Sequence, residues 1–188
     1  MKKVLIALAA TTGAFAIAAP ACAEGPRAEI HTGVDVIAAD GDSQTGITYG
    51  IGVGYDIAVS PKWEVGVDLS ADYATTEGCE TSAIVANDKA CVDARRDLAA
   101  ALRVGYKVSE QGTLYALAGY TNARFQAAYT TPAGVTTRDS ANFDGFRLGA
   151  GYQHASGDKL YGKVEYRYSN YEGNIERHQG LIGLGVKF

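Results

Sequence analysis

The sequence predicts an all-β protein, an eight-stranded antiparallel up-and-down transmembrane β-barrel. From Arg27 onward apolar and polar residues alternate with a period of two, and no convincing stretch shows the 3.6-residue period of a helix. The alternating segments number eight, which is the smallest barrel whose interior side chains can fill. The connections between them are alternately short and long, as are the periplasmic turns and extracellular loops of outer-membrane barrels.

We expect strands at about residues 27–38, 46–57, 63–73, 94–108, 113–125, 142–153, 160–170 and 177–188. The first begins the alternation at Arg27, and the second shows it most cleanly, with Ile47 to Ile57 on one face and glycine and Asp56 on the other. The third places Trp63 to Tyr73 opposite acids and serine, and the fourth places Leu98 to Tyr106 opposite charged residues. Each strand therefore has one apolar and one polar face.

The second half follows the same rule with one exception. The fifth segment is ambiguous, because both of its faces mix small, apolar and polar residues. The sixth sets Phe146 to Tyr152 against arginine and glycine, and the seventh sets Val164 to Tyr168 against lysine, glutamate and arginine. The eighth carries Ile182 to Phe188 on one face and mostly glycine and lysine on the other. A small barrel in lipid has an apolar outer surface and a crowded, polar lumen, and this is the pattern that the strands show.

Short turns rich in Pro, Gly, Ser and Asp are expected at 58–62, 109–112 and 154–159. Longer polar links are expected at about 39–45, 74–93, 126–141 and 171–176, all extracellular if both termini are periplasmic. A lipocalin-like soluble barrel is the structural rival. The glycine-rich charged face argues against it, because that face suits a crowded lumen better than a solvated exterior.

Aromatic side chains near the ends of the apolar faces also favour the membrane. Trp63 and Tyr73 are ten residues apart, about 25 Å of height for a strand tilted by about 40°. That height equals the apolar band of an outer-membrane barrel. We expect an aromatic girdle formed by Tyr49, Tyr55, Trp63, Tyr73, Tyr106, Tyr152, Tyr166 and Tyr168.

The first residues read as a secretory signal peptide, residues 1–23, followed by the barrel domain, residues 24–188. Lys2 and Lys3 precede an apolar stretch, and Ala21-Cys22-Ala23 is an A-x-A cleavage site. A lipoprotein acylated at Cys22 is the alternative. Without the leader, 15 basic residues face 21 acidic ones, a net charge of −6, and no basic patch predicts a nucleic-acid partner.

Two cysteines remain, Cys79 and Cys91, in one polar segment of a chain exported to an oxidising compartment. We expect a disulfide between them. A redox or metal-binding pair is not favoured, because the C-x-x-C spacing and neighbouring histidines are absent. No cofactor or metal site is predicted. The segment from Asp40 to Gln44 resembles a calcium loop, but its twelfth position is Ile51 rather than a glutamate.

The charged side chains of the polar faces should converge inside the lumen. We expect a network of Glu64, Asp68, Asp97, Arg103, Arg147, Lys163, Glu165 and Arg167. Buried charge must be paired, so the network is expected to plug the barrel. A narrow porin-like channel for ions or small solutes is the alternative.

The leader, the run Val164-Glu165-Tyr166-Arg167-Tyr168 and the closing Gly183 to Phe188 resemble the small outer-membrane barrel family of the OmpA transmembrane domain, OmpX and the opacity proteins. The resemblance covers the whole mature chain. It implies localisation in the bacterial outer membrane, lipid and lipopolysaccharide as surroundings, and Phe188 as the signal for the barrel-assembly machinery. No peptidoglycan-binding domain follows Phe188, so anchoring to the cell wall is not expected.

Because family members include adhesins and envelope proteins, we expect a non-enzymatic, envelope-structural or surface-interaction role through extracellular loops with an unknown surface ligand. A lipid A-modifying enzyme is a further alternative, since some such barrels use a His-x-Ser-Asn element. Here Arg167 stands where the histidine base should be, and His154-Ala155-Ser156 lies in a predicted turn without the Asn. The other histidines, His31 and His178, are expected at strand ends.

Overall fold

The computed structural model describes residues 25–39 and 42–188, which form nine β-strands and no helix. The predicted signal peptide lies outside the described residues. None of the described residues belongs to a helix long and apolar enough to cross a membrane. The strands are β1 (Gly25–Ala39), β2 (Asp42–Ala58), β3 (Trp63–Ala74), β4 (Glu77–Thr81), β5 (Lys89–Lys107), β6 (Gly112–Thr130), β7 (Thr136–Ser156), β8 (Leu160–Tyr171) and β9 (Ile175–Lys187).

Eight of these strands form a closed ring. Neighbouring strands pair antiparallel along the chain, β1 pairs with β9, and β3 pairs with β5, so each stave has two partners. The ninth, β4, is a five-residue strand that pairs only with β5. This ring confirms the predicted eight-stranded up-and-down barrel. Full closure leaves no unpaired backbone edge facing lipid, which is what a membrane-spanning sheet requires.

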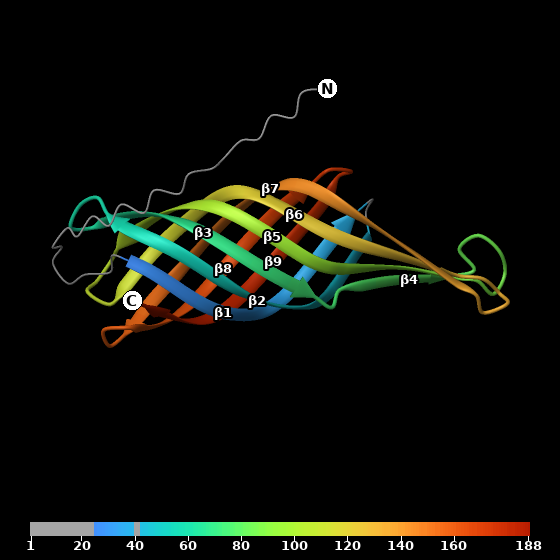
Figure 1. Ribbon diagram of the computed structural model, residues 1–188, viewed down its shortest axis with the longest axis horizontal. Coiled ribbons are helices and arrows are strands. Elements are labelled where there is room, and N and C mark those ends of the chain that lie inside the picture. The colour runs from blue at the N-terminus through green and yellow to red at the C-terminus, as the bar shows by residue number, and fades with distance from the viewer. Residues whose placement is uncertain (1–24, 40–41) are drawn as a thin grey trace, which may run out of the picture.

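The two ends of the barrel differ (Figure 1). The terminal end carries the start of β1, the end of β9 and the short turns after β2, β5 and β7. At the opposite end β4, β5, β6 and β7 continue well beyond the ring as a narrow sheet, which we call the arm. The arm comprises β4, residues 82–95 and residues 124–144.

The arm corrects the predicted loops. Segments 74–93 and 126–141 were expected to be links, yet most of their residues extend β5, β6 and β7 or form β4. The link 39–45 is also mostly strand, because β1 and β2 pair as far as Ala39 and Asp42. Alternation failed to detect these extensions for a physical reason. A sheet that has water on both faces needs no apolar face, so its strands carry no period-two pattern.

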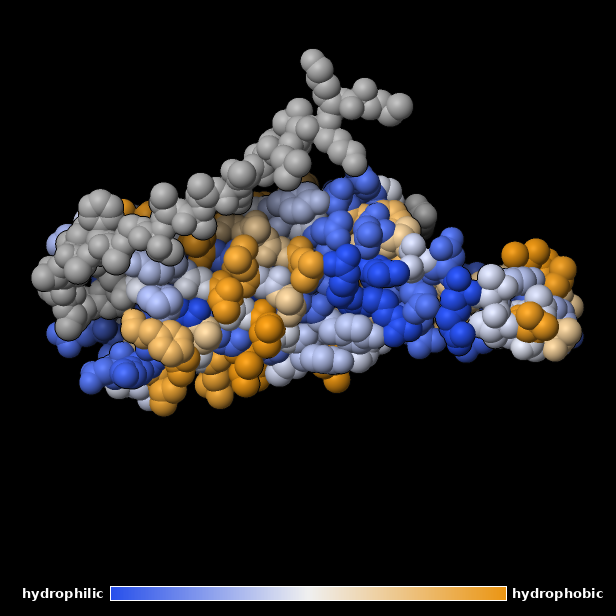
Figure 2. All heavy atoms as spheres, in the orientation of Figure 1, coloured by the Kyte–Doolittle hydropathy of each residue, from blue (hydrophilic) through white to orange (hydrophobic). Residues whose placement is uncertain are grey.

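The outer wall of the ring is apolar, as alternation predicts. Exposed apolar side chains include Ile30, Ile51, Leu69, Leu102 and Leu184. On the face that Figure 2 shows, hydrophobic side chains gather over the ring, bordered by a strongly hydrophilic surface toward the arm. The two faces of the fifth predicted segment, which the sequence left ambiguous, are distinct in the structure. In β6, Leu114 and Tyr120 face outward while Tyr115, Leu117 and Thr121 face the lumen.

Candidate functional site

The lumen is filled with charge. All eight residues of the predicted network are buried within it, with no more than 7% of any of them exposed. Six further buried charged residues and one buried histidine, which the predicted network lacks, join them: Arg27, Glu29, His31, Asp35, Asp56, Asp72 and Arg177. Their inward positions follow the period-two pattern of β1, β2, β3 and β9, so strict alternation from Arg27 would have found them.

Charge in the lumen is nearly balanced. Eight buried acids face six buried arginines and lysines, and Asp88 is left out of this count because it lies in the arm. His31 and the half-buried Lys187 complete the set. A buried charge costs several kcal/mol unless it is paired, so this balance is a requirement of the fold.

Toward the terminal end, Arg27 is the centre of the pairing. Its Nε lies 3.0 Å from Asp56 Oδ2 and its Nη2 lies 2.5 Å from Asp68 Oδ2. Arg103 shares Asp56 at 3.0 Å and stacks over the Tyr115 ring at 4.0 Å from its centroid. Glu64 is the exception, since its nearest cation is Arg103 at 3.8 Å and its carboxylate oxygens receive no hydrogen bond.

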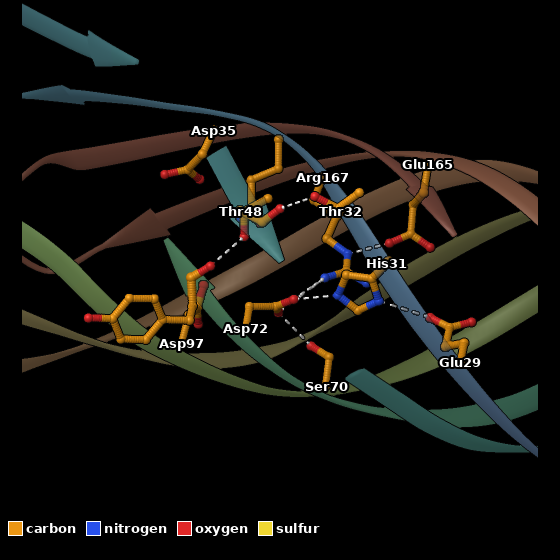
Figure 3. Close-up of polar contacts among 12 residues, drawn as sticks. Glu29, His31, Thr32, Asp35, Thr48, Ser70, Asp72, Asp97, Glu165 and Arg167 are labelled. Carbon is orange, nitrogen blue, oxygen red and sulfur yellow. Dashed lines mark hydrogen bonds and ion pairs between the residues drawn. The ribbon is translucent and has the colours of Figure 1, made fainter. Parts of the chain in front are cut away.

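In the middle of the lumen, His31 lies between two carboxylates (Figure 3). Its Nε2 contacts Asp72, and its Nδ1 is 3.5 Å from Glu29 Oε1. Arg167 donates to Asp72 at 3.2 Å and also contacts Glu165. His31 was expected at a strand end; that prediction was wrong, because it occupies the middle of β1 with 4% of its surface exposed.

Toward the arm end, Asp97 collects four donors. Thr121 and Tyr171 donate hydroxyls at 2.5 and 2.7 Å, Arg177 donates at 2.9 Å, and Arg147 also contacts the carboxylate. Above it, Ala74, Ala94, Ala123, Phe125 and Tyr171 form an apolar cluster, which Ile37, Phe143 and Ile175 extend. This cluster closes the arm-end mouth of the barrel over the polar network.

The remaining space inside is small. A cavity of about 10 Å³, lined by Asp68, Ser70, Arg147 and Arg167 among others, has room for about one water molecule. The arrangement is therefore a paired network of buried charges beneath an apolar cap.

The eight aromatic residues of the predicted girdle all lie on the outer wall. Trp63 and Tyr106 stack at 4.9 Å near the terminal end, and Tyr49 and Tyr73 stack at 5.7 Å near the arm end. Tyr55 and Tyr152 lie near the ends of β2 and β7 at the terminal side, and Tyr166 and Tyr168 lie on β8 beside His178. Outer-membrane barrels carry such rings at both edges of the apolar band, and the girdle stays a prediction for this chain.

The arm is held by a disulfide and an ordered loop. Cys79 and Cys91 are bonded across β4 and β5. In the loop after β4, the amides of Ala83, Ile84 and Val85 donate to the Asp88 carboxylate at 2.7 to 3.0 Å. The Val85 amide contributes most to holding the pKa of Asp88 below its usual range.

The serine motifs weighed as enzyme sites are not arranged for catalysis at a lipid surface. Ser169 is 1% exposed inside the lumen, where its hydroxyl accepts a hydrogen bond from Arg147 Nε at 3.0 Å. His154 is at the terminal end, and its Nδ1 contacts the Tyr152 hydroxyl at 3.2 Å. His178 faces the outer wall, where its Nδ1 contacts the Tyr166 hydroxyl at 2.7 Å. The last residue, Phe188, is 73% exposed, and its amide donates to the Pro26 carbonyl at 3.0 Å.

A family model described as "Outer membrane protein beta-barrel domain" matches residues 7–188. The chain belongs to this family. Membership and architecture together indicate the bacterial outer membrane. Outer-membrane barrels generally have short periplasmic turns and longer extracellular loops, and the turns at the terminal end are the short ones. A search of curated proteins found no match.

Solved structures of other outer-membrane barrels share this fold. Ail, the attachment invasion locus protein of Yersinia pestis, is 16% identical with a TM-score of 0.61, covering 88% of this chain and 100% of Ail. Neisserial surface protein A is 15% identical with a TM-score of 0.58, covering 87% and 97%. A major outer membrane protein from Thermus thermophilus is 13% identical with a TM-score of 0.51, covering 87% and 100%. At these identities the likeness concerns the fold.

Proposed function

We propose that this protein is a non-enzymatic surface-interaction protein, in which a closed barrel displays the arm to partners outside the cell. The observation that carries the proposal is the arm itself. Three strands continue past the aromatic girdle and form a hydrogen-bonded sheet with β4, although a barrel that only spans the membrane needs no such extension. From the level of Arg124 to Thr130 the arm rises by six residues, about 20 Å along the strand.

The arm offers backbone as well as side chains. The pairing of β7 with β8 begins at Gly145 and Tyr171, so Thr136–Asp144 has a strand partner on the β6 side alone. Residues 136–142 are exposed throughout. An unpaired edge of this length can accept an extended strand from a partner, with backbone hydrogen bonds supplying affinity.

The tip of the arm adds apolar contact area. Ile84, Val85 and Val135 are 74%, 49% and 63% exposed at the ends of its two hairpins, and Figure 2 shows this apolar tip beyond the hydrophilic stretch. The ordered Asp88 loop presents two of the three. Exposed apolar residues grouped at a projecting tip are typical of interaction surfaces.

Biogenesis completes the proposal. We propose export through a cleaved leader, residues 1–23, and recognition of Phe188 by the barrel-assembly machinery. The filled lumen gives no support to solute transport. Ail has been solved in complex with a heparin analogue, sucrose octasulfate, which makes immobilised heparin a suitable first probe for this chain.

The test uses cells that display the full chain or a trimmed chain, in which residues 75–94 and 126–140 are each replaced by a short glycine-containing turn. A gel-mobility shift on heating confirms that both barrels fold. We expect the full chain to increase adherence to epithelial monolayers or to immobilised heparin, and the trimmed chain to lose this increase. Equal adherence by the two, with both barrels folded, would refute a role for the arm.

A further inference from the structure

A β-bulge in β5 gathers arginines at the base of the arm. Ala94 pairs with Phe125 and Asp97 pairs with Ala123, so Arg95 and Arg96 together face the single residue Arg124 on β6. Bulges re-aim side chains, and here two consecutive arginines both reach the outer wall. Arg95 donates to the Tyr73 hydroxyl at 2.5 Å, and Arg96 donates to Asn142 Oδ1 at 3.4 Å.

Three guanidinium groups at one level of a sheet repel each other, and like charges directly opposite destabilise strand pairing. Carboxylates do little to compensate. Arg95 lies 3.6 Å from Asp93, but Arg96 and Arg124 form no ion pair with any described residue, and Arg124 Nη2 donates to the Ser140 hydroxyl at 2.6 Å. The nearby Asp144 accepts instead from Asn122 and Tyr120. A cationic cluster in which two of the three guanidinium groups lack an ion pair among the described residues is complementary to an anionic ligand.

The height of the cluster points to the kind of anion. Tyr120, on the outer wall of β6, is four residues below Arg124, which is about 10 Å of height for a tilted strand. The polar headgroup layer of a bilayer leaflet begins at the aromatic girdle and is about 5–8 Å thick. Arg96 also pairs with Tyr73, a predicted girdle residue near the arm end, so the arginine cluster lies at and just above the level of the outer-leaflet headgroups.

An apolar groove leads down from the same strands. It has a volume of about 340 Å³ and is lined by Val67, Leu69, Ala100, Leu102 and Ala118, together with Asp68, Ala101 and Gly119 between them. Ala100 pairs with Tyr120, so the upper end of the groove lies four residues below Arg96 and Arg124 on their strands. A molecule with acyl chains in the groove would have its headgroup beside Arg96 and Arg124.

We infer that Arg95, Arg96 and Arg124 bind the phosphate of an outer-leaflet glycolipid of the lipid A type, with an acyl chain in the Leu69–Ala118 groove. Guanidinium groups suit this role because their planar N–H donors match phosphate oxygens in pairs. The site differs from the one proposed for the arm's protein partner, since it uses arginine side chains at the base of the arm rather than the unpaired backbone of β7 or the apolar tip.

The test measures binding of bisphosphorylated lipid A to the full chain in lipid nanodiscs made from neutral phospholipid. The variants are Arg96→Gln with Arg124→Gln, Ala118→Phe to fill the groove, and Arg138→Gln as a matched control higher on the arm. We expect the double arginine variant to weaken binding at least about tenfold, the loss of two charge-assisted contacts. Ala118→Phe should weaken it several-fold, and Arg138→Gln should leave it within about twofold.

Two further binding measurements identify which part of the lipid is recognised. Dephosphorylated lipid A should bind the natural chain as weakly as lipid A binds the double variant, and excess inorganic phosphate should not displace lipid A. The inference is overturned if Arg138→Gln weakens binding as much as the double variant, if dephosphorylated lipid A binds equally well, or if inorganic phosphate displaces the lipid.

Discussion

Asp97 gives the sharpest test of the lumen network. Its carboxylate is fully buried and accepts from Thr121, Tyr171, Arg147 and Arg177. Asp97→Asn keeps the volume but removes the negative charge, and its amide nitrogen would point at donors. Breaking a buried ion pair costs about 3–5 kcal/mol. Because Arg147 and Arg177 retain Asp72 and Asp35, we expect a loss near 3 kcal/mol, about a hundredfold in the folding equilibrium constant.

The matched control is Glu64→Gln. Glu64 is 1% exposed, accepts no hydrogen bond and is 3.8 Å from Arg103, so removing its charge should change stability by less than about 1 kcal/mol. Both free energies come from urea unfolding in detergent micelles, followed by the fluorescence of Trp63, the single tryptophan. If Asp97→Asn and Glu64→Gln cost the same, hydrogen-bonded pairing does not decide which lumen charges stabilise the barrel.

Three other predictions concern the seam, the disulfide and the loop. A Cβ at Gly33 would lie 1.9 Å from the Gly180 carbonyl oxygen, so Gly33→Ala should prevent formation of the heat-modifiable barrel. A Cβ at Gly180 would have no atom within 4 Å, so Gly180→Ala should fold. Equal yields of folded barrel from the two variants would contradict this reasoning. Cys79→Ser with Cys91→Ser removes a disulfide that contributes about 3 kcal/mol to stability. The arm of this variant should become sensitive to limited proteolysis while the heat-modifiable barrel persists. An arm as resistant as that of the natural chain would refute this. Because the pKa of Asp88 is lowered, its carboxylate stabilises the loop fully above the ordinary aspartate pKa of about 3.9, and this stabilisation is lost as the pH falls through the lower pKa of Asp88 itself. NMR signals of the Val85 amide should therefore stay native-like at pH 4. Asp88→Asn should shift them at pH 7.

Period-two alternation predicted the barrel because each stave separates lipid from a polar lumen. That contrast placed Glu64, Arg103 and Glu165 inside and Trp63 and Tyr166 outside. The same alternation places His31 inside, because its neighbours Ile30 and Thr32 on β1 face outward. The burial of His31 between two carboxylates was not predicted. Its position depends on Glu29 and on Asp72 from β3, a contact between residues 41 apart in sequence.

The arm could not be predicted in the same way. Residues 136–142 are exposed throughout, so no burial pattern distinguishes strand from loop there. The arginine cluster could not be predicted either, because it depends on a bulge that places Arg95 and Arg96 opposite Arg124. Strict alternation would have turned either Arg95 or Arg96 toward the lumen. Pairing register decides both features, and a single sequence does not reveal it.

A closed barrel that serves as a support, with the protein acting from its outer surface, should not conduct ions. Planar-bilayer recording of the purified full chain tests this claim most directly, because buried ion pairs fill the lumen and the apolar cluster around Phe125 covers its arm end. We expect no stable conductance, with the trimmed chain equally silent. A stable, ohmic single-channel current from the full chain would contradict the closed barrel.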